Sequence, residues 1–189
     1  MANEIQVFRT LLSKEEYVQL CEKYYDKKGN MQVNYYFDTP RFTLKASDIG
    51  LRVRKRDKYE LTLKRKKGYV TQELNNTITA DEFKGLLSTG RMPDSEIAKE
   101  ISDVIKDQLL ENYMSLSTFR ITVPIMSGRI AIDKCVYVDK KDYELEYEST
   151  APYEQAKAEF VEMVKSFGIQ YKRALPKIKR AYEALKDQM

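Results

Sequence analysis

A strict alternation of apolar and charged residues in several short segments constrains the fold of this chain more than any other feature. Within residues 51–56, Leu51 and Val53 alternate with three arginines, and residues 143–148 alternate three apolar or aromatic side chains with three glutamates. Successive side chains of a β-strand point to opposite faces of the sheet. The pattern therefore predicts strands with one apolar and one charged face, with positive charge on one strand and negative charge on another.

The remaining segments extend this pattern into an α+β fold. Alternation and turn residues predict roughly eight or nine strands, at residues 5–10, 32–38, 49–56, 59–66, 69–75, 117–126, 129–133, 136–139 and 143–148. Capping signals and helical spacing predict helices at residues 13–26, 80–87, 95–108, 153–167 and after Pro176. Because short turns join most strands, we expect one domain over residues 1–189, a closed antiparallel β-barrel of about eight strands with helices packed outside.

The charged face of such a sheet has two interpretations. Antiparallel sheets commonly leave one face in water, and a solvated charged face is the ordinary case. Two observations favour a charged lumen instead: the helices need the apolar face to cover their own apolar stripes, and the charges segregate by strand rather than mixing. Buried charges need partners or a ligand, and arginines opposed to glutamates suit a polyphosphate with a divalent cation.

Composition excludes several kinds of chemistry. The chain has no histidine, which removes the usual general base and the usual zinc ligands, and all-oxygen ligation favours Mg²⁺ or Mn²⁺. Cys21 and Cys135 lack a zinc-like spacing and are expected to be free thiols in a reducing compartment. The net charge of +4 is small, and no apolar run approaches a membrane span, so we expect a cytoplasmic protein without nucleic-acid or membrane partners.

The ordered segments of this chain resemble the CYTH, or triphosphate tunnel metalloenzyme, family and its bacterial triphosphatase branch. The matching segments are residues 36–40, 50–54, 60–64, 72–75, 118–120, 132–133 and 144–146, followed by a late Lys-x-x-Arg at Lys177 and Arg180. The resemblance implies that the substrate is held by Arg9, Arg52, Arg54, Lys64, Arg120, Lys177 and Arg180. It implies metal binding by Glu4, Glu73, Asp133, Glu144 and Glu146. It implies catalytic roles for Glu73, Glu144, Glu146 and Lys64.

The chain departs from the family at its start, where the family carries an E-x-E-x-K signature on its first strand. Aligned on Glu4, the second glutamate becomes Gln6 and the lysine becomes Phe8. Aligned on Arg9 as the basic residue, both acidic positions become apolar. A bulge between Gln6 and Phe8 is a further way to bring Glu4 and Arg9 to one face. Every alignment lacks at least one carboxylate.

These features lead to one principal function and three alternatives. The principal one is a Mg²⁺- or Mn²⁺-dependent phosphohydrolase, monomeric or homodimeric, acting on inorganic triphosphate or a related organic triphosphate, with a metal-activated water attacking the terminal phosphorus as the family implies. The first alternative is a non-catalytic polyphosphate- or nucleotide-binding protein with a weakened metal site. Adenylate cyclase activity and a nucleic-acid-binding barrel are the others.

Overall fold

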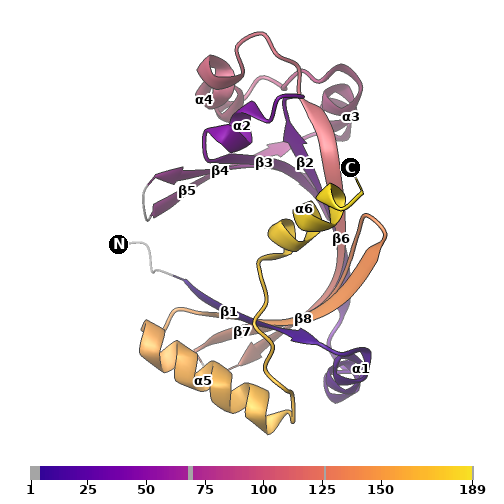
Figure 1. Ribbon diagram of the computed structural model, residues 1–189, viewed down its shortest axis with the longest axis vertical. Helices are drawn as coiled ribbons and strands as arrows, with labels where there is room; N and C mark the ends of the chain where they lie inside the picture. The colour runs from indigo at the N-terminus through magenta and orange to yellow at the C-terminus, as the bar shows by residue number, and fades with distance from the viewer. Residues whose placement is uncertain (1–4, 68–69, 126, 189) are drawn as a thin grey trace. The chain divides into compact units, whose positions relative to one another are not determined.

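The computed structural model describes residues 5–67, 70–125 and 127–188. Eight strands form a sheet in the order β1-β8-β7-β6-β2-β3-β4-β5 (Figure 1). The strands are β1 (Gln6–Leu12), β2 (Gly29–Asp38), β3 (Ile49–Lys55), β4 (Tyr59–Lys67), β5 (Val70–Ile78), β6 (Glu111–Ile125), β7 (Gly128–Tyr137) and β8 (Lys140–Ser149). The helices are α1 (Lys14–Lys23), α2 (Thr43–Ala46), α3 (Ala80–Thr89), α4 (Glu96–Ile105), α5 (Tyr153–Ser166) and α6 (Lys177–Lys186).

The predicted antiparallel sheet of about eight strands is confirmed. Its order begins at β1 and ends at β5, and within the described residues no hydrogen-bonded pairing closes it into a barrel. The chain divides into two compact units: a terminal unit of residues 1–31 and 117–189, and a central unit of residues 32–116. None of the helices in the described ranges is long and apolar enough to cross a bilayer.

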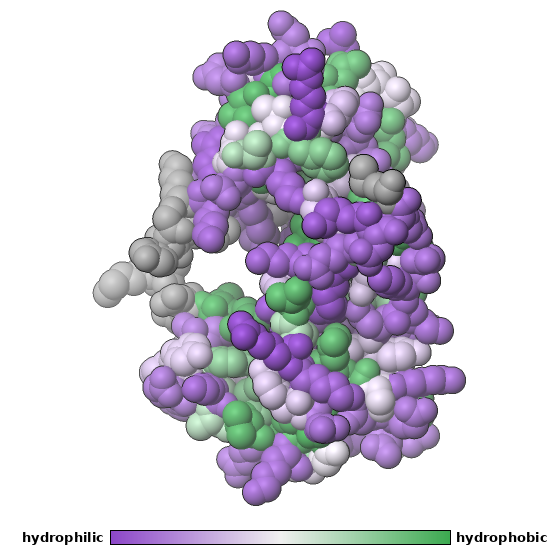
Figure 2. Space-filling view, viewed as in Figure 1, coloured by the Kyte–Doolittle hydropathy of each residue, from purple (hydrophilic) through white to green (hydrophobic). Residues whose placement is uncertain are grey.

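In the terminal unit, α1 and α5 cover the apolar face of the strands (Figure 1). Phe160 and Met163 of α5 and Leu20 of α1 are buried in one cluster with side chains from β7 and β8, among them Ile130, Ile132, Leu145 and Tyr147. Burial of side chains of this size contributes about 1.5–3 kcal/mol each. The predicted capping box begins α1: Ser13 Oγ accepts from the N–H of Glu16, and Glu16 accepts from the N–H of Ser13. The third helix of the terminal unit, α6, presents mainly hydrophilic residues on its outward side (Figure 2).

In the central unit, α2, α3 and α4 cover the apolar face of β2–β5 (Figure 1). Their buried side chains, including Leu44, Phe83, Leu86, Ile97 and Ile101, share a cluster with Leu51, Val53, Leu61 and Leu63 of the strands. The predicted capping box of Thr79 and Glu82 begins α3, and Gly90 ends it at φ 68°. A Cβ at Gly90 would lie 2.5 Å from the carbonyl oxygen of Leu110, so only glycine fits. The expectation that helices cover the apolar faces is confirmed in both units.

The short helix α2, which sequence reasoning missed, is organised by Asp38. The Oδ1 atom of Asp38 accepts from the backbone N–H groups of Thr39 (2.7 Å) and Leu44 (2.9 Å), and Oδ2 accepts from that of Lys45 (2.9 Å). Asp38 itself is buried, at 3% exposed. The carboxylate in the segment of residues 36–40 is therefore structural, since it satisfies the free donors that begin a helix.

Some predicted boundaries were wrong. Residues 129–139 were expected to form two strands, but β7 continues without interruption to Tyr137 and turns to β8 through Val138 at φ 53°. The prediction failed because Lys134 falls on the apolar face, opposite Tyr143, and interrupts the alternation. Strand β6 begins at Glu111 rather than residue 117. The predicted limits at residues 69 and 126 lie outside the described residues.

Replacing Asp38 with alanine is expected to lower the free energy of unfolding by about 2–4 kcal/mol, because three backbone donors lose a charged acceptor. Denaturant titration of wild type and variant measures this difference. Asp57→Ala, at an exposed turn position, is the control and is expected to stay within about 0.5 kcal/mol of wild type. Equal stability of the two variants would show that Asp38 does not organise α2.

Candidate functional site

Three carboxylates of the terminal unit converge on one face of β7 and β8; we call Asp133, Glu144 and Glu146 the carboxylate cluster. Asp133 and Glu144 stand directly opposite each other in the β7–β8 register, and Glu146 follows two residues along β8. Asp133 and Glu144 are fully buried and Glu146 is 8% exposed. Gly128 begins β7, where a Cβ would lie 1.9 Å from the carbonyl oxygen of Glu148, so glycine allows the two strands to approach at that end.

Basic side chains from strands β6 and β1 neutralise part of this cluster. Arg120 of β6 donates to both oxygens of Asp133, from Nε at 2.8 Å and Nη2 at 2.7 Å, and to Glu146 at 3.1 Å. Arg9 of β1 stands opposite Glu146 in the register, with Nη2 at 3.6 Å from Oε2. Bidentate arginine–carboxylate pairs of this kind combine strength with fixed geometry.

Helix α6 supplies two further cations. Lys177, its first residue, places Nζ 2.8 Å from Asp133, 2.5 Å from Glu144 and 3.3 Å from Glu146. Arg180, one turn later, donates to Glu144 at 2.6 Å and to Asp142 at 2.9 Å. All seven predicted site residues that belong to the terminal unit within the described chain therefore join one network: Arg9, Arg120, Asp133, Glu144, Glu146, Lys177 and Arg180.

The network shifts the pKa values of its members. Burial alone would raise the pKa of Glu146, but Lys177, Arg120 and Arg9 outweigh it and lower that pKa to about 2. Burial likewise opposes the charge of Lys177, yet Asp133, Glu146 and Glu144 raise its pKa above the ordinary value. Both groups therefore stay ionised at neutral pH.

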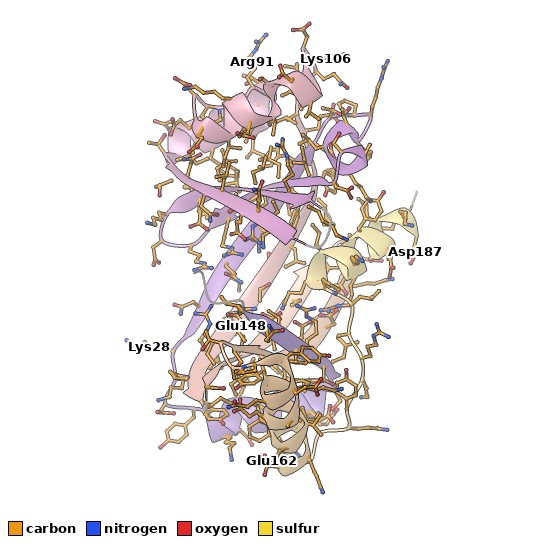
Figure 3. The ribbon with its side chains drawn as sticks, turned by 90° about the vertical axis from the view of Figure 1, so that its left-hand side faces the viewer. Lys28, Arg91, Lys106, Glu148, Glu162 and Asp187 are labelled. Carbon is orange, nitrogen blue, oxygen red and sulfur yellow. The ribbon has the colours of Figure 1, made fainter. Side chains whose placement is uncertain are left out.

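Sequence reasoning missed Asp142 and the pairing of Arg129 with Glu148. Asp142 accepts from Arg180 and from the hydroxyl of Tyr137 at 2.5 Å. Arg129 donates to Glu148 on the neighbouring strand, and Figure 3 shows Glu148 on the opposite side of the sheet from α5, whose outward side carries Glu162. Asp142 shares the parity of Glu144, so extending β8 by its alternation would have identified it.

In the central unit, the polar face of β2–β5 carries a second set of predicted residues, which we call the arginine face: Arg52, Arg54, Lys64 and Glu73 with their neighbours Asn34, Glu60, Thr62 and Asn75. The ladders place Arg52 opposite Thr62, and Lys64 opposite Glu73. Lys64 pairs with Glu73 at 3.0 Å. Although burial opposes it, this pairing lowers the pKa of Glu73. The predicted metal ligand Glu73 is thus engaged by a lysine of its own unit.

The arginine face has more positive than negative charge. Arg54 donates to Asn34 at 3.1 Å and lies 4.0 Å from Glu60. Burial, together with Arg52 and Arg56, lowers the pKa of Arg54 to about 10, so the guanidinium remains charged at neutral pH. The Nε atom of Arg52 is buried and has no hydrogen-bond partner in the described part of the chain. A buried donor without a partner indicates a place for an acceptor.

The first strand resolves the alternative alignments. Residues 6–12 pair with residues 149–143 one for one, so the bulge suggested by the sequence is absent from β1. Arg9 lies on the face of the carboxylate cluster, and the residue two positions earlier on that face is Val7, opposite Glu148. Glu4 lies outside the described residues. Among the described residues, no three His, Cys, Asp or Glu side chains are arranged as a ready metal site.

A family model for the CYTH domain matches residues 6–182. The chain belongs to the CYTH family. It is 30% identical over 188 residues to the Bacillus subtilis (strain 168) protein named "Putative triphosphatase YjbK", with 97% of each chain covered. It resembles the crystal structure of a "putative adenylate cyclase" from Bacillus halodurans, at 30% identity and a TM-score of 0.79, covering 92% of this chain and 95% of that one. A Hippeastrum protein described as a "putative adenylyl cyclase" that reveals a dominant triphosphatase activity has the same fold, at 20% identity, a TM-score of 0.79 and 96% coverage of both chains.

The lowered pKa of Glu146 predicts a specific acid sensitivity. Because the folded pKa of about 2 lies below the unfolded value of about 4.3, ionised Glu146 contributes on the order of 3 kcal/mol above about pH 5, and this contribution is lost as the pH falls toward 2. Denaturant titrations across this range are expected to show a shallower loss of stability in Glu146→Gln than in wild type. Glu162→Gln, on the exposed side of α5, is expected to keep the wild-type slope. Identical slopes for Glu146→Gln and wild type would contradict the assignment.

Proposed function

We propose that this CYTH-family chain is a divalent-metal-dependent phosphohydrolase whose substrate is inorganic triphosphate or a related organic triphosphate. The observation that carries the proposal is the arginine face, where Arg52 has a buried donor without a partner and Arg54 is crowded by like charge. A triphosphate supplies the acceptor oxygens and the negative charge that this face lacks. As the sequence predicts, the proposal also includes a small-molecule substrate and a cytoplasmic location.

The chain's own residues perform positioning and charge neutralisation. Arg52 and Arg54 occupy neighbouring same-face positions of β3, so both guanidinium groups are on one face, where a single triphosphate can accept from both. Lys64 adds an ammonium on the adjacent strand. Phosphoryl transfer develops charge on the non-bridging and leaving oxygens, and fixed cations that stabilise this charge need no reorganisation during the reaction.

The cofactor in this proposal is Mg²⁺ or Mn²⁺. The carboxylate cluster fits such an ion chemically, since it offers only oxygen donors and the chain contains no histidine. Asp133, Glu144 and Glu146 are the residues that would hold it. When bound, the ion would polarise phosphoryl oxygens and favour attack by water.

The comparisons support the hydrolase over the cyclase. The Bacillus subtilis relative, matched over nearly its whole length, carries a triphosphatase name, and the Hippeastrum protein is described by its dominant triphosphatase activity. The Bacillus halodurans protein carries an adenylate cyclase name, so ATP with a cyclic-nucleotide readout belongs in the substrate panel.

A second candidate is a polyphosphate-binding protein without turnover. It is favoured by β1, where Val7 rather than a carboxylate precedes Arg9, and by the complete engagement of the carboxylate cluster with basic side chains. Calorimetric binding of inorganic triphosphate without phosphate release under Mg²⁺ or Mn²⁺ would select this candidate over the enzyme.

Arg52→Ala is expected to lower kcat/KM for inorganic triphosphate by about 100- to 1,000-fold, because one preorganised donor to developing charge is lost. Phosphate release with Mg²⁺ or Mn²⁺ measures the effect, and unchanged thermal melting confirms that the fold is retained. Arg91→Ala is the matched control, since Arg91 is an exposed arginine of the same unit, labelled in Figure 3, and is expected to match wild type. Similar activity of the two variants would show that the arginine face is not part of the substrate-binding site.

Val7→Glu is expected to strengthen Mn²⁺ binding by about tenfold, because a carboxylate beside the carboxylate cluster adds an oxygen donor and a negative charge. Calorimetric titration with Mn²⁺ gives the affinity directly. Val18→Glu, an exposed valine of α1, is the control. Tighter binding in the control than in Val7→Glu would show that general surface charge, not this position, governs the affinity.

A further inference from the structure

The ammonium of Lys177 occupies a position that resembles that of a bound cation. Three carboxylate oxygens, one each from Asp133, Glu144 and Glu146, surround Nζ at 2.8, 2.5 and 3.3 Å. Lys177 donates hydrogen bonds to Glu144 and Glu146, and its third contact is an ion pair with Asp133. The Lys177 side chain is only 15% exposed. In this conformation the ammonium of Lys177 is engaged by three carboxylates, in contrast to the substrate-binding role that the family resemblance implies.

The basic partners of the cluster differ in how firmly the chain holds them. Arg9 and Arg120 project from strands that are fixed by hydrogen-bonded pairing and packed against the apolar core. Lys177 lies at the start of α6, in which Ala181 and Ala184 are the buried apolar residues and the larger apolar side chains are only half-buried. The outward side of this helix is hydrophilic (Figure 2).

The attachment of α6 to its unit is largely ionic. Lys177 and Arg180 contact the carboxylates of β7 and β8, and Asp187, labelled in Figure 3 beyond the end of the helix, pairs with Lys140 at 3.3 Å. The exposed Lys140–Asp187 pair contributes little net stability, and the apolar burial of α6 is confined to two alanines and the half-buried Ile178, Tyr182 and Leu185. The helix is therefore held chiefly by the same carboxylates that a metal ion would use.

The segment that precedes α6 has its own anchor. The carbonyl of Lys172 accepts from the N–H of Leu11 at 3.2 Å, the N–H of Lys172 donates to Thr10 Oγ1 at 2.8 Å, and Arg173 forms a bridge with Thr10. The chain is thus fixed to β1 up to Arg173, and residues 174–176 connect this anchor to α6. Movement of α6 requires a change only in this short connection.

We propose that Lys177 is the resident cation of the carboxylate cluster and that a divalent metal ion binds there only by displacing it, together with the start of α6. The inference rests on the proposed function and adds a form of regulation to it. With the metal absent, Lys177 holds α6 on the cluster. With the metal present, the ammonium is released and becomes available as a donor to a phosphate oxygen. Metal binding and α6 docking therefore exclude each other.

The wild-type chain tests this competition without any substrate. Hydrogen–deuterium exchange is measured with and without Mn²⁺, at concentrations where electron paramagnetic resonance shows the ion to be bound. The amides of α6 are expected to exchange at least severalfold faster with Mn²⁺, while those of α5, which is packed on the apolar core, remain unchanged. Bound Mn²⁺ with unchanged or slower exchange in α6 would overturn the proposal.

A variant tests the same competition from the other side. Lys177→Met keeps the length of the side chain and removes the ammonium, so Mn²⁺ is expected to bind at least tenfold more tightly than to wild type. Lys179→Met, an exposed lysine of the same helix, is the matched control and is expected to bind Mn²⁺ as wild type does. Equal or weaker binding by Lys177→Met, or no binding by either wild type or variant, would overturn the proposal.

The two proposals fail separately. If wild type hydrolyses inorganic triphosphate while Mn²⁺ leaves the exchange protection of α6 unchanged, the proposed displacement of Lys177 is wrong and the proposed enzymatic function stands. If Mn²⁺ displaces α6 but no phosphate is released, the competition between metal and Lys177 is supported and the proposed enzymatic function is wrong.

Discussion

The pairing of buried carboxylates on β7 and β8 with cations from other elements is the interaction on which the terminal unit depends. Asp133 and Glu144 face each other across one ladder and are fully buried, and an uncompensated charge there would cost several kcal/mol. Arg120 and Lys177 provide the compensation. Strand β6 and helix α6 are therefore joined to the β7–β8 hairpin through charge on one face, while the core joins α1 and α5 to the other.

The central unit shows the opposite charge condition, on a sheet that is likewise packed against helices. Strand pairing fixes the positions of the side chains on the arginine face, and helices pack against the opposite, apolar face of the same strands. Arg52 and Arg54 nevertheless lack enough acidic partners of their own, as the buried Nε of Arg52 and the lowered pKa of Arg54 show. A fixed surface with incomplete charge compensation is preorganised for an anion, because the cost of holding the cations together was met during folding.

The alternation of residues along each strand predicted which side chains share a face, but it did not predict the ion-pair partner of each side chain. Alternation alone placed Arg52 with Arg54 and Glu144 with Glu146, and the capping boxes at Ser13 and Thr79 were visible as spacings. Register depends on pairing between distant segments, so the opposition of Asp133 and Glu144 had no local signal. Lys177 reaches the cluster from a helix far along the chain, and its three contacts arise only from tertiary packing. The hydrogen bonds of Asp38 that organise α2 could not be predicted from the sequence for the same reason.

Charge balance connects the unusual first strand to the position of Lys177. Four cations, Arg9, Arg120, Lys177 and Arg180, pair with four carboxylates on this face, which are the three of the cluster and the neighbouring Asp142. With Val7 in β1, this strand adds a cation to the cluster but no carboxylate from that position. A divalent ion added to an already neutral, buried group would leave an excess of positive charge, which is costly where water is excluded. One cation must therefore leave, and Lys177, on a helix with little apolar burial, is the one whose departure disturbs the sheet least.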